Sequence, residues 1–316
     1  MSVLVTGGNG FVGKNLIREL HSYRRVFGEI ITVNRRDCKS PFITKSYRCN
    51  LGFADNREGE FYYLKRIMRH HEPEYIFHLA SKATVKMSED EVFQILQDNI
   101  LSTQKVCQWS PKGARVILAS SVIVYGDWLF SPPPSGDPKY EESYKTEPTS
   151  IYGITKRASE GILKYYTSTG QINGVSARMC ATVGRGLTHG VVYDFIEKIL
   201  NNPVLEALGS RPGSTKPYCH IDDLIQAFLI LAINKDVNGE YNIVPDDVIN
   251  IEEVAKSIMG SLEVYKNIKW LGEKSNWKGD NKLISVDNQK TKDLGWKPKY
   301  ESKQAIIQAV KDIMRK

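Results

Sequence analysis

A run of closely spaced glycines near the start of the chain carries the clearest chemical signal in the sequence. Residues 6–13 read Thr-Gly-Gly-Asn-Gly-Phe-Val-Gly and fit both the G-x-x-G-x-x-G and the G-x-G-x-x-G spacing. Such glycines allow a tight turn, close approach of the backbone to a pyrophosphate, and close packing of a helix on a strand. An apolar strand precedes the turn, and a helix N-terminus with free N–H groups follows it. The sequence therefore predicts a dinucleotide-binding turn, in which the expected cofactor contacts are Gly7, Gly10, Phe11 and Val12.

The end of the second expected strand bears on which dinucleotide binds. An acidic residue normally stands there and holds the ribose 2′-hydroxyl. This chain has Asn34 instead, followed by Arg35 and Arg36. Loss of the carboxylate removes a repulsion, and the guanidinium groups can pair with a 2′-phosphate. We therefore predict NADP as the cofactor. The alternative is NAD, with both arginines simply facing solvent.

A tyrosine and a lysine stand four residues apart in Tyr152-Gly-Ile-Thr-Lys156, a spacing that puts both on one face of a helix. Upstream, Ser120-Ser121-Val-Ile-Val-Tyr125-Gly126 closes an apolar strand. The other motifs in the set are His78-Leu79-Ala80, Asn99 and Pro217-Tyr218…His220…Asp222-Asp223. This ordered set spans nearly the whole chain. It resembles the extended short-chain dehydrogenase/reductase family, most closely the NAD(P)-dependent nucleotide-sugar epimerase/dehydratase branch that contains the UDP-glucose 4-epimerase-like members.

The resemblance implies three catalytic residues for hydride transfer between a sugar carbon and a nicotinamide. Tyr152 would be the general acid/base for the oxygen on that carbon. A free phenol has a pKa of about 10, too high for a base at neutral pH. Lys156, together with the oxidised nicotinamide, would lower that pKa and would also hold the nicotinamide ribose. Ser121 would hydrogen-bond the reacting oxygen.

The same resemblance assigns further positions to the cofactor and the substrate. The additional cofactor contacts would be Asn50, Leu51, Leu79, Ala80, Ser81 and Asn99. The substrate contacts would be Thr84, Ser121, Ala181, His189, Lys216 and Lys278. The chain departs from 4-epimerases at Ala181, since their Arg-x-x-Asn segment reads Arg178-Met-Cys-Ala181 here. The base, the sugar and even the diphosphate of the substrate therefore stay open, and no metal site is expected.

Two apolar residues bear on the type of reaction. The dehydratases of the resembled family carry an Asp-Glu pair directly after the catalytic Ser/Thr, but this chain has Val122 and Ile123. Neither side chain can transfer a proton, which disfavours 4,6-dehydration. The leading hypothesis is a nucleotide-sugar epimerase that oxidises C4 transiently with bound NAD(P). The alternatives are an NADP-dependent 4-ketoreductase or dehydrogenase with exchanging cofactor, and a non-catalytic redox sensor.

The hydrophobic pattern predicts the elements that must position these residues. Continuous apolar runs at residues 3–5, 30–33, 75–79, 115–119 and 175–178 are typical of buried strands, and helical patterns at 62–70, 91–107 and 150–168 alternate with them. This pattern predicts an α/β fold: a Rossmann-type doubly wound parallel sheet with a smaller, irregular C-terminal substrate lobe. We expect a dinucleotide-binding domain at 1–178, to which 217–238 return, and a substrate-binding lobe at 179–316.

The composition narrows the classes of partner. The net charge of +7 is spread over short clusters, which favours a mixed-charge surface over nucleic-acid binding. The five cysteines form no C-x-x-C pair and indicate reduced thiols. The longest apolar run is too short to span a membrane, and a first strand at Val3 leaves no room for a signal peptide. We expect a cytoplasmic protein that binds a nucleotide-diphosphate sugar. By resemblance, it would be a homodimer formed through helices 91–107 and 150–168.

Overall fold

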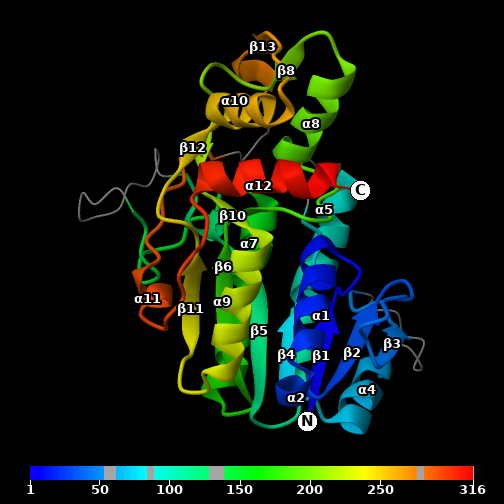
Figure 1. The fold of residues 1–316 in the computed structure, drawn as a ribbon. Helices are drawn as coiled ribbons and strands as arrows, with labels where there is room; N and C mark the ends of the chain where they lie inside the picture. Colours follow the sequence, from blue (N-terminus) through cyan, green and yellow to red (C-terminus); the bar gives the residue numbers. More distant parts are fainter. Residues whose placement is uncertain (53–61, 84–88, 128–138, 276–280, 316) are drawn as a thin grey trace.

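The core of the molecule is a seven-stranded sheet in which every pair of neighbouring strands is parallel. The computed structural model describes residues 1–52, 62–83, 89–127, 139–275 and 281–315. The strand order is β11-β6-β5-β4-β1-β2-β3 (Figure 1). The strands are β1 (Ser2–Thr6), β2 (Glu29–Asn34), β3 (Lys45–Arg48), β4 (Tyr75–His78), β5 (Ala114–Ser121), β6 (Ile172–Met179) and β11 (Gly239–Ile243). The order reverses between β1 and β4, the switch point at which such sheets bind dinucleotides.

Helices cover both faces of the sheet. One face carries α1 (Phe11–Ser22) and α9 (Ile221–Ile233), and the other carries α4 (Tyr63–His71), α6 (Ser102–Trp109) and α7 (Ile151–Ser168). The alternation of side chains along β1 explains the two layers, because Val3 and Val5 pack in the first core while Leu4 packs in the second. The predicted doubly wound parallel sheet is confirmed.

A long helical segment leads into β5 on the second face. It consists of α5 (Glu89–Leu96), the π-helical turn η1 (Gln97–Leu101) and α6. It occupies the range of the helix predicted at 91–107, while α4 and α7 occupy those predicted at 62–70 and 150–168. A short helix, α2 (Arg24–Phe27), leads into β2, and a 3-10 turn, η2 (Val122–Tyr125), follows β5. The predicted pattern therefore located the framework that carries the candidate residues.

A second, smaller layer of structure lies beyond the carboxyl ends of the strands (Figure 1). Its helices are α8 (Val191–Asn201), α10 (Ile251–Leu262), α12 (Ser302–Met314) and the 3-10 turn η3 (Glu273–Ser275). The short helix α11 (Gln289–Lys292) lies instead beside the edge strand β11 (Figure 1). Its strands pair as β7 (Ala181–Val183) with β10 (Tyr218–His220), β9 (Thr215–Lys216) with β12 (Ile249–Asn250), and β8 (Leu205–Ala207) with β13 (Ile268–Trp270). A core of its own, which includes Ile196, Ile258 and Ile306, holds this lobe together.

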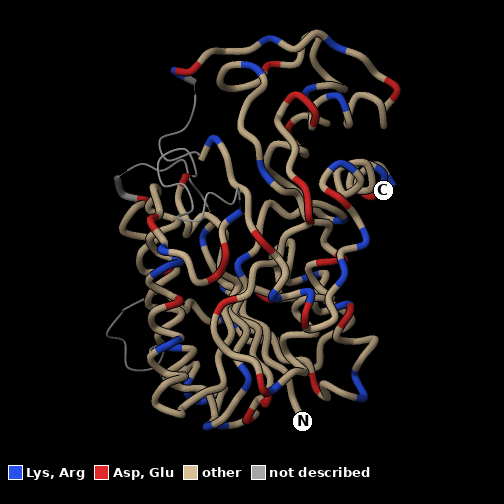
Figure 2. The backbone as a smooth tube through the Cα atoms, turned by 90° about the vertical axis from the view of Figure 1, so that its left-hand side faces the viewer, with Lys and Arg blue, Asp and Glu red and all other residues tan. Residues whose placement is uncertain are grey.

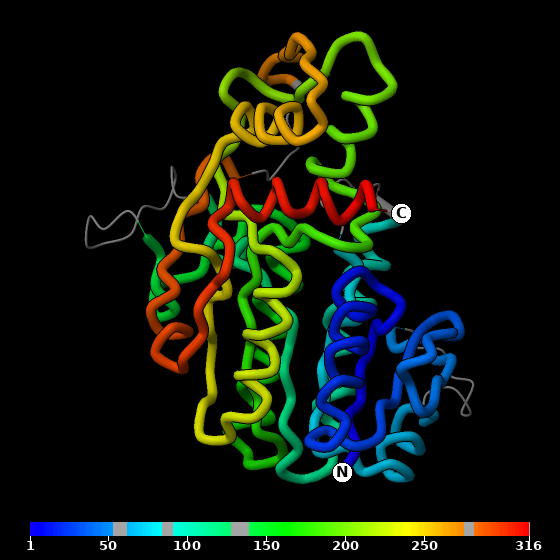
Figure 3. Tube along the Cα trace, viewed as in Figure 1, coloured from blue at the N-terminus to red at the C-terminus, as the bar shows by residue number. Residues whose placement is uncertain are grey.

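The chain passes between the two layers more than once. Figure 3 shows the green segment rising from the sheet into the lobe, the yellow-green segment returning to the sheet, and red α12 crossing the base of the lobe. The return includes α9 and continues through β11, which pairs with β6. Basic and acidic residues are interspersed along the trace (Figure 2). Among the described residues, no helix is both long and apolar enough to cross a membrane.

Candidate functional site

The glycine turn lies where β1 meets α1, and its conformation explains its composition. Gly7 has φ +74°, and a Cβ on it would lie 2.8 Å from the backbone nitrogen of Ala80. A Cβ on Gly13 would lie 2.4 Å from the carbonyl oxygen of Gly7. Gly10 is the N-cap of α1 and supplies no side chain to the first turn, which also has no acidic residue. The N–H groups at the start of α1 are therefore left for an anion.

A cavity of about 660 Å³ opens beside this turn. The ends of β2 and β4, the segment after β3, and η1 supply its walls. Ten residues predicted for the cofactor line it: Gly7, Gly10, Asn34, Arg35, Arg36, Asn50, Leu51, Leu79, Ala80 and Ser81. The sequence reasoning missed Asn9, Val33, Arg48, Cys49, Gly52, Asp98 and Ser102, which also line it. Arg48, Cys49 and Gly52 lie at or just after the end of β3, a short strand that was not predicted; recognising this strand in the sequence would have pointed to them.

Buried polar atoms in this cavity fit a polar ligand such as a dinucleotide. Asn34 accepts a hydrogen bond from the backbone N–H of Asn9 at 3.1 Å through its side-chain oxygen. Among the described residues, Nδ2 of Asn34 and Oδ1 of Asn50 are buried and have no hydrogen-bond partner. Buried polar atoms are normally satisfied. These two atoms therefore point to a ligand that supplies the missing hydrogen bonds.

A second cavity, of about 460 Å³, joins the turn to the upper lobe. Gly7, Gly10, Leu79 and Ser81 line both cavities. Its other predicted cofactor and catalytic residues are Phe11, Val12, Tyr152 and Lys156. The lobe contributes Ala181 and His189, both predicted for the substrate, together with Thr182, Val183, Leu187, Val192 and Tyr218. A ligand in this second cavity would thus contact the turn, the Tyr/Lys helix and the lobe at once.

Tyr152 and Lys156 lie in the first turns of α7, whose N-terminus is capped by Ser150 through a hydrogen bond from the Gly153 N–H at 3.1 Å. Burial raises the pKa of Tyr152, and a hydrogen bond with Ser121 opposes that rise. Lys156 Nζ lies 5.6 Å from the centre of the Tyr152 ring. The three predicted catalytic residues are therefore brought together.

Lys156 is held from the opposite side. Its Nζ donates a hydrogen bond of 2.7 Å to the carbonyl oxygen of Ala119 on β5. Burial lowers the pKa of Lys156 to about 8, while the negative charge of Glu160 acts to raise it. An amine with a pKa near neutrality exchanges its proton readily, and its charged form can stabilise a phenolate beside it.

A buried ion pair lies behind these residues. Glu160 accepts hydrogen bonds from Nε and Nη2 of Arg178, each at 2.9 Å, and from the Ser120 hydroxyl at 2.6 Å. Arg178 also donates to the Tyr125 hydroxyl at 2.8 Å. Both charged side chains are at most 3% exposed. Arg178 lies in the segment that the sequence analysis compared with a substrate-binding segment. In the structure it pairs with Glu160 beside Lys156.

Two polar residues of the recognised motifs are used internally. His78 contacts the hydroxyls of Thr6 at 2.7 Å and Thr103 at 3.1 Å, and burial, reinforced by the charge of Lys156, lowers its pKa to about 3. The Asn99 oxygen accepts from Ser81 Oγ and the N–H of Lys82, and its amide donates to Thr155. Asn99 is not among the residues that line either cavity. Its contacts position the cavity wall.

Other predicted substrate residues lie elsewhere or cannot be placed. Lys216 is in β9 and is not among the residues that line the second cavity. Thr84 and Lys278 fall outside the described residues. Within the described part of the chain, no group of three or more His, Cys, Asp or Glu side chains could hold a metal ion.

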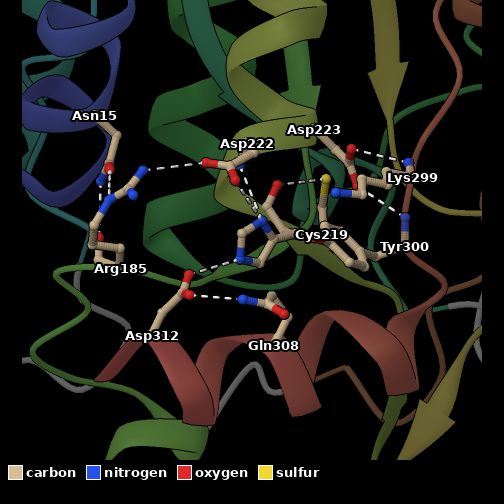
Figure 4. A network of polar contacts seen from close by, with 10 residues as sticks. Asn15, Arg185, Cys219, Asp222, Asp223, Lys299, Tyr300, Gln308 and Asp312 are labelled. Atoms are coloured by element: carbon tan, nitrogen blue, oxygen red, sulfur yellow. Dashed lines mark hydrogen bonds and ion pairs between the residues drawn. The ribbon is translucent and has the colours of Figure 1, made fainter. Parts of the chain in front are cut away.

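Figure 4 shows a polar network that joins α1 to the lobe. Asn15 on α1 donates to the carbonyl oxygen of Arg185 at 3.0 Å, and Arg185 pairs with Asp222 at 3.5 Å. His220, 1% exposed, caps α9 and contacts Asp312 of α12 at 3.1 Å. The Pro-Tyr-x-His…Asp-Asp motif therefore fixes the lobe to the cofactor helix rather than contacting a ligand through its histidine.

Comparisons with known proteins agree with this geometry. The model of the NAD dependent epimerase/dehydratase family matches residues 3–244. UDP-glucuronic acid decarboxylase 6 of Arabidopsis thaliana is 26% identical, with 97% of this chain and 87% of that protein covered. A putative UDP-glucose 4-epimerase of Methanocaldococcus jannaschii is 25% identical, with 98% and 97% covered. The solved Thermus thermophilus UDP-glucose 4-epimerase in complex with NAD has the same fold, with a TM-score of 0.82 and 23% identity over 100% of this chain and 99% of that one. The chain belongs to the NAD dependent epimerase/dehydratase family.

Proposed function

We propose that the protein is an epimerase of a nucleotide-activated sugar. It would oxidise the sugar at C4, let the 4-keto sugar turn over, and return the hydride to its other face with NAD(P) retained. The observation that carries this proposal is the second cavity, in which Tyr152 and Lys156 face the glycine turn and the lobe together. The names of several relatives, which include UDP-glucose 4-epimerases, support the substrate class.

The residues of this chain have defined tasks in that reaction. The dinucleotide, when bound, supplies a hydride acceptor that becomes the donor in the return step. Tyr152 takes the proton of the sugar hydroxyl during oxidation and gives it back during reduction. Lys156 in its charged form stabilises the phenolate, and Ser121 orients the reacting oxygen by a hydrogen bond. The helix N-terminus at Gly10 would hold the pyrophosphate.

The residues after Ser121 favour epimerisation over dehydration. Val122 is 4% exposed and Ile123 is partly buried, and neither can protonate or deprotonate a neighbouring carbon. Some relatives are named as dehydratases or as UDP-glucuronic acid decarboxylases. Those reactions therefore enter the test as alternatives. A ketoreductase with exchanging NADP is the second candidate, and the observation in its favour is the pair Arg35 and Arg36 beside the first cavity.

The test incubates purified protein with UDP-glucose, UDP-N-acetylglucosamine, UDP-glucuronate and dTDP-glucose, and separates the products by chromatography. Epimer formation without net change in nicotinamide absorbance supports the proposal. Stoichiometric oxidation of added NADPH would instead establish the reductase, loss of carbon dioxide a decarboxylase, and a 4-keto-6-deoxy product a dehydratase.

A tyrosine variant tests the assigned base. We expect Tyr152→Phe to lower kcat by about 10²–10⁴-fold, the usual contribution of a general acid/base. Tyr165→Phe is the matched control, because Tyr165 lies on the same helix but is 62% exposed. Full turnover by Tyr152→Phe would remove Tyr152 from the mechanism.

We also propose that the protein is a homodimer formed through α5–α6 and α7. Large apolar side chains on these helices face outward: Phe93 is 66% exposed, Ile154 45% and Tyr165 62%. Exposed apolar side chains grouped on neighbouring helices are typical of an interface. The family resemblance places a four-helix contact on the same helices.

A further inference from the structure

The first cavity combines positive charge with one buried carboxylate. Its lining includes Arg35, Arg36 and Arg48, whereas Asp98 is the one acidic side chain among the described residues that line it. Asp98 lies in the π-helical turn η1 and is 8% exposed. A carboxylate this deeply buried, at a cavity also lined by three arginines, is a candidate for a functional role.

Contacts from three segments fix the Asp98 carboxylate in place. Oδ2 pairs with Nη1 of Arg35 at 3.4 Å, and Oδ1 accepts a hydrogen bond from Nε2 of Gln94 at 3.0 Å. The backbone after β3 packs directly on it, since a Cβ on Gly52 would lie 2.3 Å from Oδ1. Asp98 therefore stands between the ends of β2 and β3, where the adenosine end of a dinucleotide belongs.

The ion pair changes what Arg35 can do for a ligand. The sequence indicates NADP because Arg35 and Arg36 follow Asn34, where a carboxylate would normally stand. In the structure, Asp98 of η1 places a carboxylate in the same cavity, and one oxygen of this carboxylate is paired with Arg35. A 2′-phosphate would have to share that guanidinium with Asp98 and accept a like charge beside it.

The hydrogen-bonding groups around the pair match a hydroxyl better than a phosphate. The Nδ2 group of Asn34 is a buried donor with no partner in the described part of the chain, and Asp98 is a pure acceptor when ionised. A ribose hydroxyl both donates and accepts, so it can satisfy both groups. A phosphate dianion only accepts, so it can satisfy Asn34 but is repelled by Asp98.

We propose that Asp98 is a specificity-determining residue that selects against a 2′-phosphate, so that the cavity prefers NAD to NADP despite Arg35 and Arg36. This inference rests on the proposed function only in requiring that a dinucleotide binds at the glycine turn. It replaces the predicted NADP by NAD as the preferred cofactor.

The test measures the dissociation constants of NAD and NADP by calorimetry on the cofactor-stripped, full-length protein. We expect wild type to bind NAD at least about tenfold more tightly, and Asp98→Asn to reduce the NAD-to-NADP preference by about tenfold, because a like-charge contact is removed. Asp37→Asn is the matched control: Asp37 is exposed, lies two residues after Arg35 and is not among the residues that line the cavity. Its preference should equal that of wild type.

A second variant keeps the test decisive if Asp98→Asn does not fold. Asp98→Ser also removes the carboxylate, so we expect it to reduce the NAD-to-NADP preference by a similar factor. Tighter binding of NADP by wild type, or an Asp98→Asn preference equal to that of wild type, would overturn the inference alone. Failure of both dinucleotides to bind wild type would overturn the proposed function and the inference with it.

Discussion

The substitution Glu160→Gln tests how the framework behind Tyr152 and Lys156 works. Glu160 is 1% exposed and accepts three hydrogen bonds, two of them from Arg178 and one from Ser120. Glutamine keeps the shape of the side chain but removes the negative charge. One of its two terminal groups becomes a donor that faces the donors of Arg178. The variant therefore leaves a guanidinium that is 3% exposed without its counter-ion.

The magnitude follows from the burial of both partners. Breaking a buried ion pair by removing one partner typically costs about 3–5 kcal/mol, because the remaining charge is left uncompensated. Whole domains are stable by only about 5–15 kcal/mol. We therefore expect Glu160→Gln to remove a large share of the unfolding free energy. Replacing both charges, as Glu160→Gln with Arg178→Met, should cost less than the sum of the single changes.

The same substitution should move the pH dependence of activity. Glu160 acts to raise the pKa of Lys156, which burial has lowered to about 8. Without that charge the pKa of Lys156 falls further, so more of the amine is neutral at neutral pH. Because the proposed mechanism needs the charged amine, the alkaline limb of the kcat profile should move to lower pH.

Urea unfolding of the purified variants, followed by circular dichroism and fluorescence, measures the first effect, and initial rates across pH measure the second. Glu206→Gln is the control, because Glu206 pairs with Lys269 at an exposed site and the unfolding midpoint should barely move. A loss below about 1 kcal/mol for Glu160→Gln, as for an exposed pair, would refute the account of the buried ion pair. An unmoved alkaline limb would refute the electrostatic link to Lys156.

Three further predictions concern other parts of the molecule. Burial lowers the pKa of His78 to about 3, so below about pH 6.5 the unfolded chain binds a proton there and the folded chain does not. The unfolding free energy of wild type should therefore fall by about 2–3 kcal/mol between neutral pH and pH 4.5. The stability of His78→Gln should depend less on pH over this range. Gly13→Ala places a Cβ 2.4 Å from a carbonyl oxygen, so calorimetry should show at least about tenfold weaker dinucleotide binding; unchanged affinity would contradict the close packing at the turn. Ile154→Glu should give a monomer in sedimentation experiments, whereas Tyr265→Glu, at a residue 78% exposed in the lobe, should leave a dimer; a wild-type monomer would contradict the proposed interface.

The buried strands could be predicted from the sequence, and the edge strands could not. β1, β2, β4, β5 and β6 are covered on both faces and are therefore rich in apolar residues. β3 reads Lys-Ser-Tyr-Arg with no residue fully buried, and β11 begins with Gly-Glu. Both lie at edges of the sheet, where one side of the ladder is open and polar residues are tolerated. Their sequences look like loops because only tertiary pairing makes them strands.

The candidate site shows the same division between local and long-range information. Tyr152 and Lys156 are four residues apart, so helical geometry alone places them together. Arg35 and Asp98 are 63 positions apart and meet only because the sheet brings η1 beside the end of β2. The sequence marks Arg178 only as the start of a segment compared with the Arg-x-x-Asn segment of 4-epimerases, and no local pattern reveals that it pairs with Glu160. A sequence can thus name the reactive groups without showing which charges surround them.

Those surrounding charges decide whether Tyr152 and Lys156 can act. Burial raises the pKa of Tyr152 and lowers that of Lys156, so it favours the neutral form of each. The chemically useful pair has the opposite charge state, a phenolate beside an ammonium. Among the described residues, Glu160 is the charged group that acts to raise the pKa of Lys156, and Glu160 accepts two hydrogen bonds from Arg178. The buried pair of Glu160 and Arg178 therefore has a second role. It favours the charged form of Lys156, on which the base strength of Tyr152 depends.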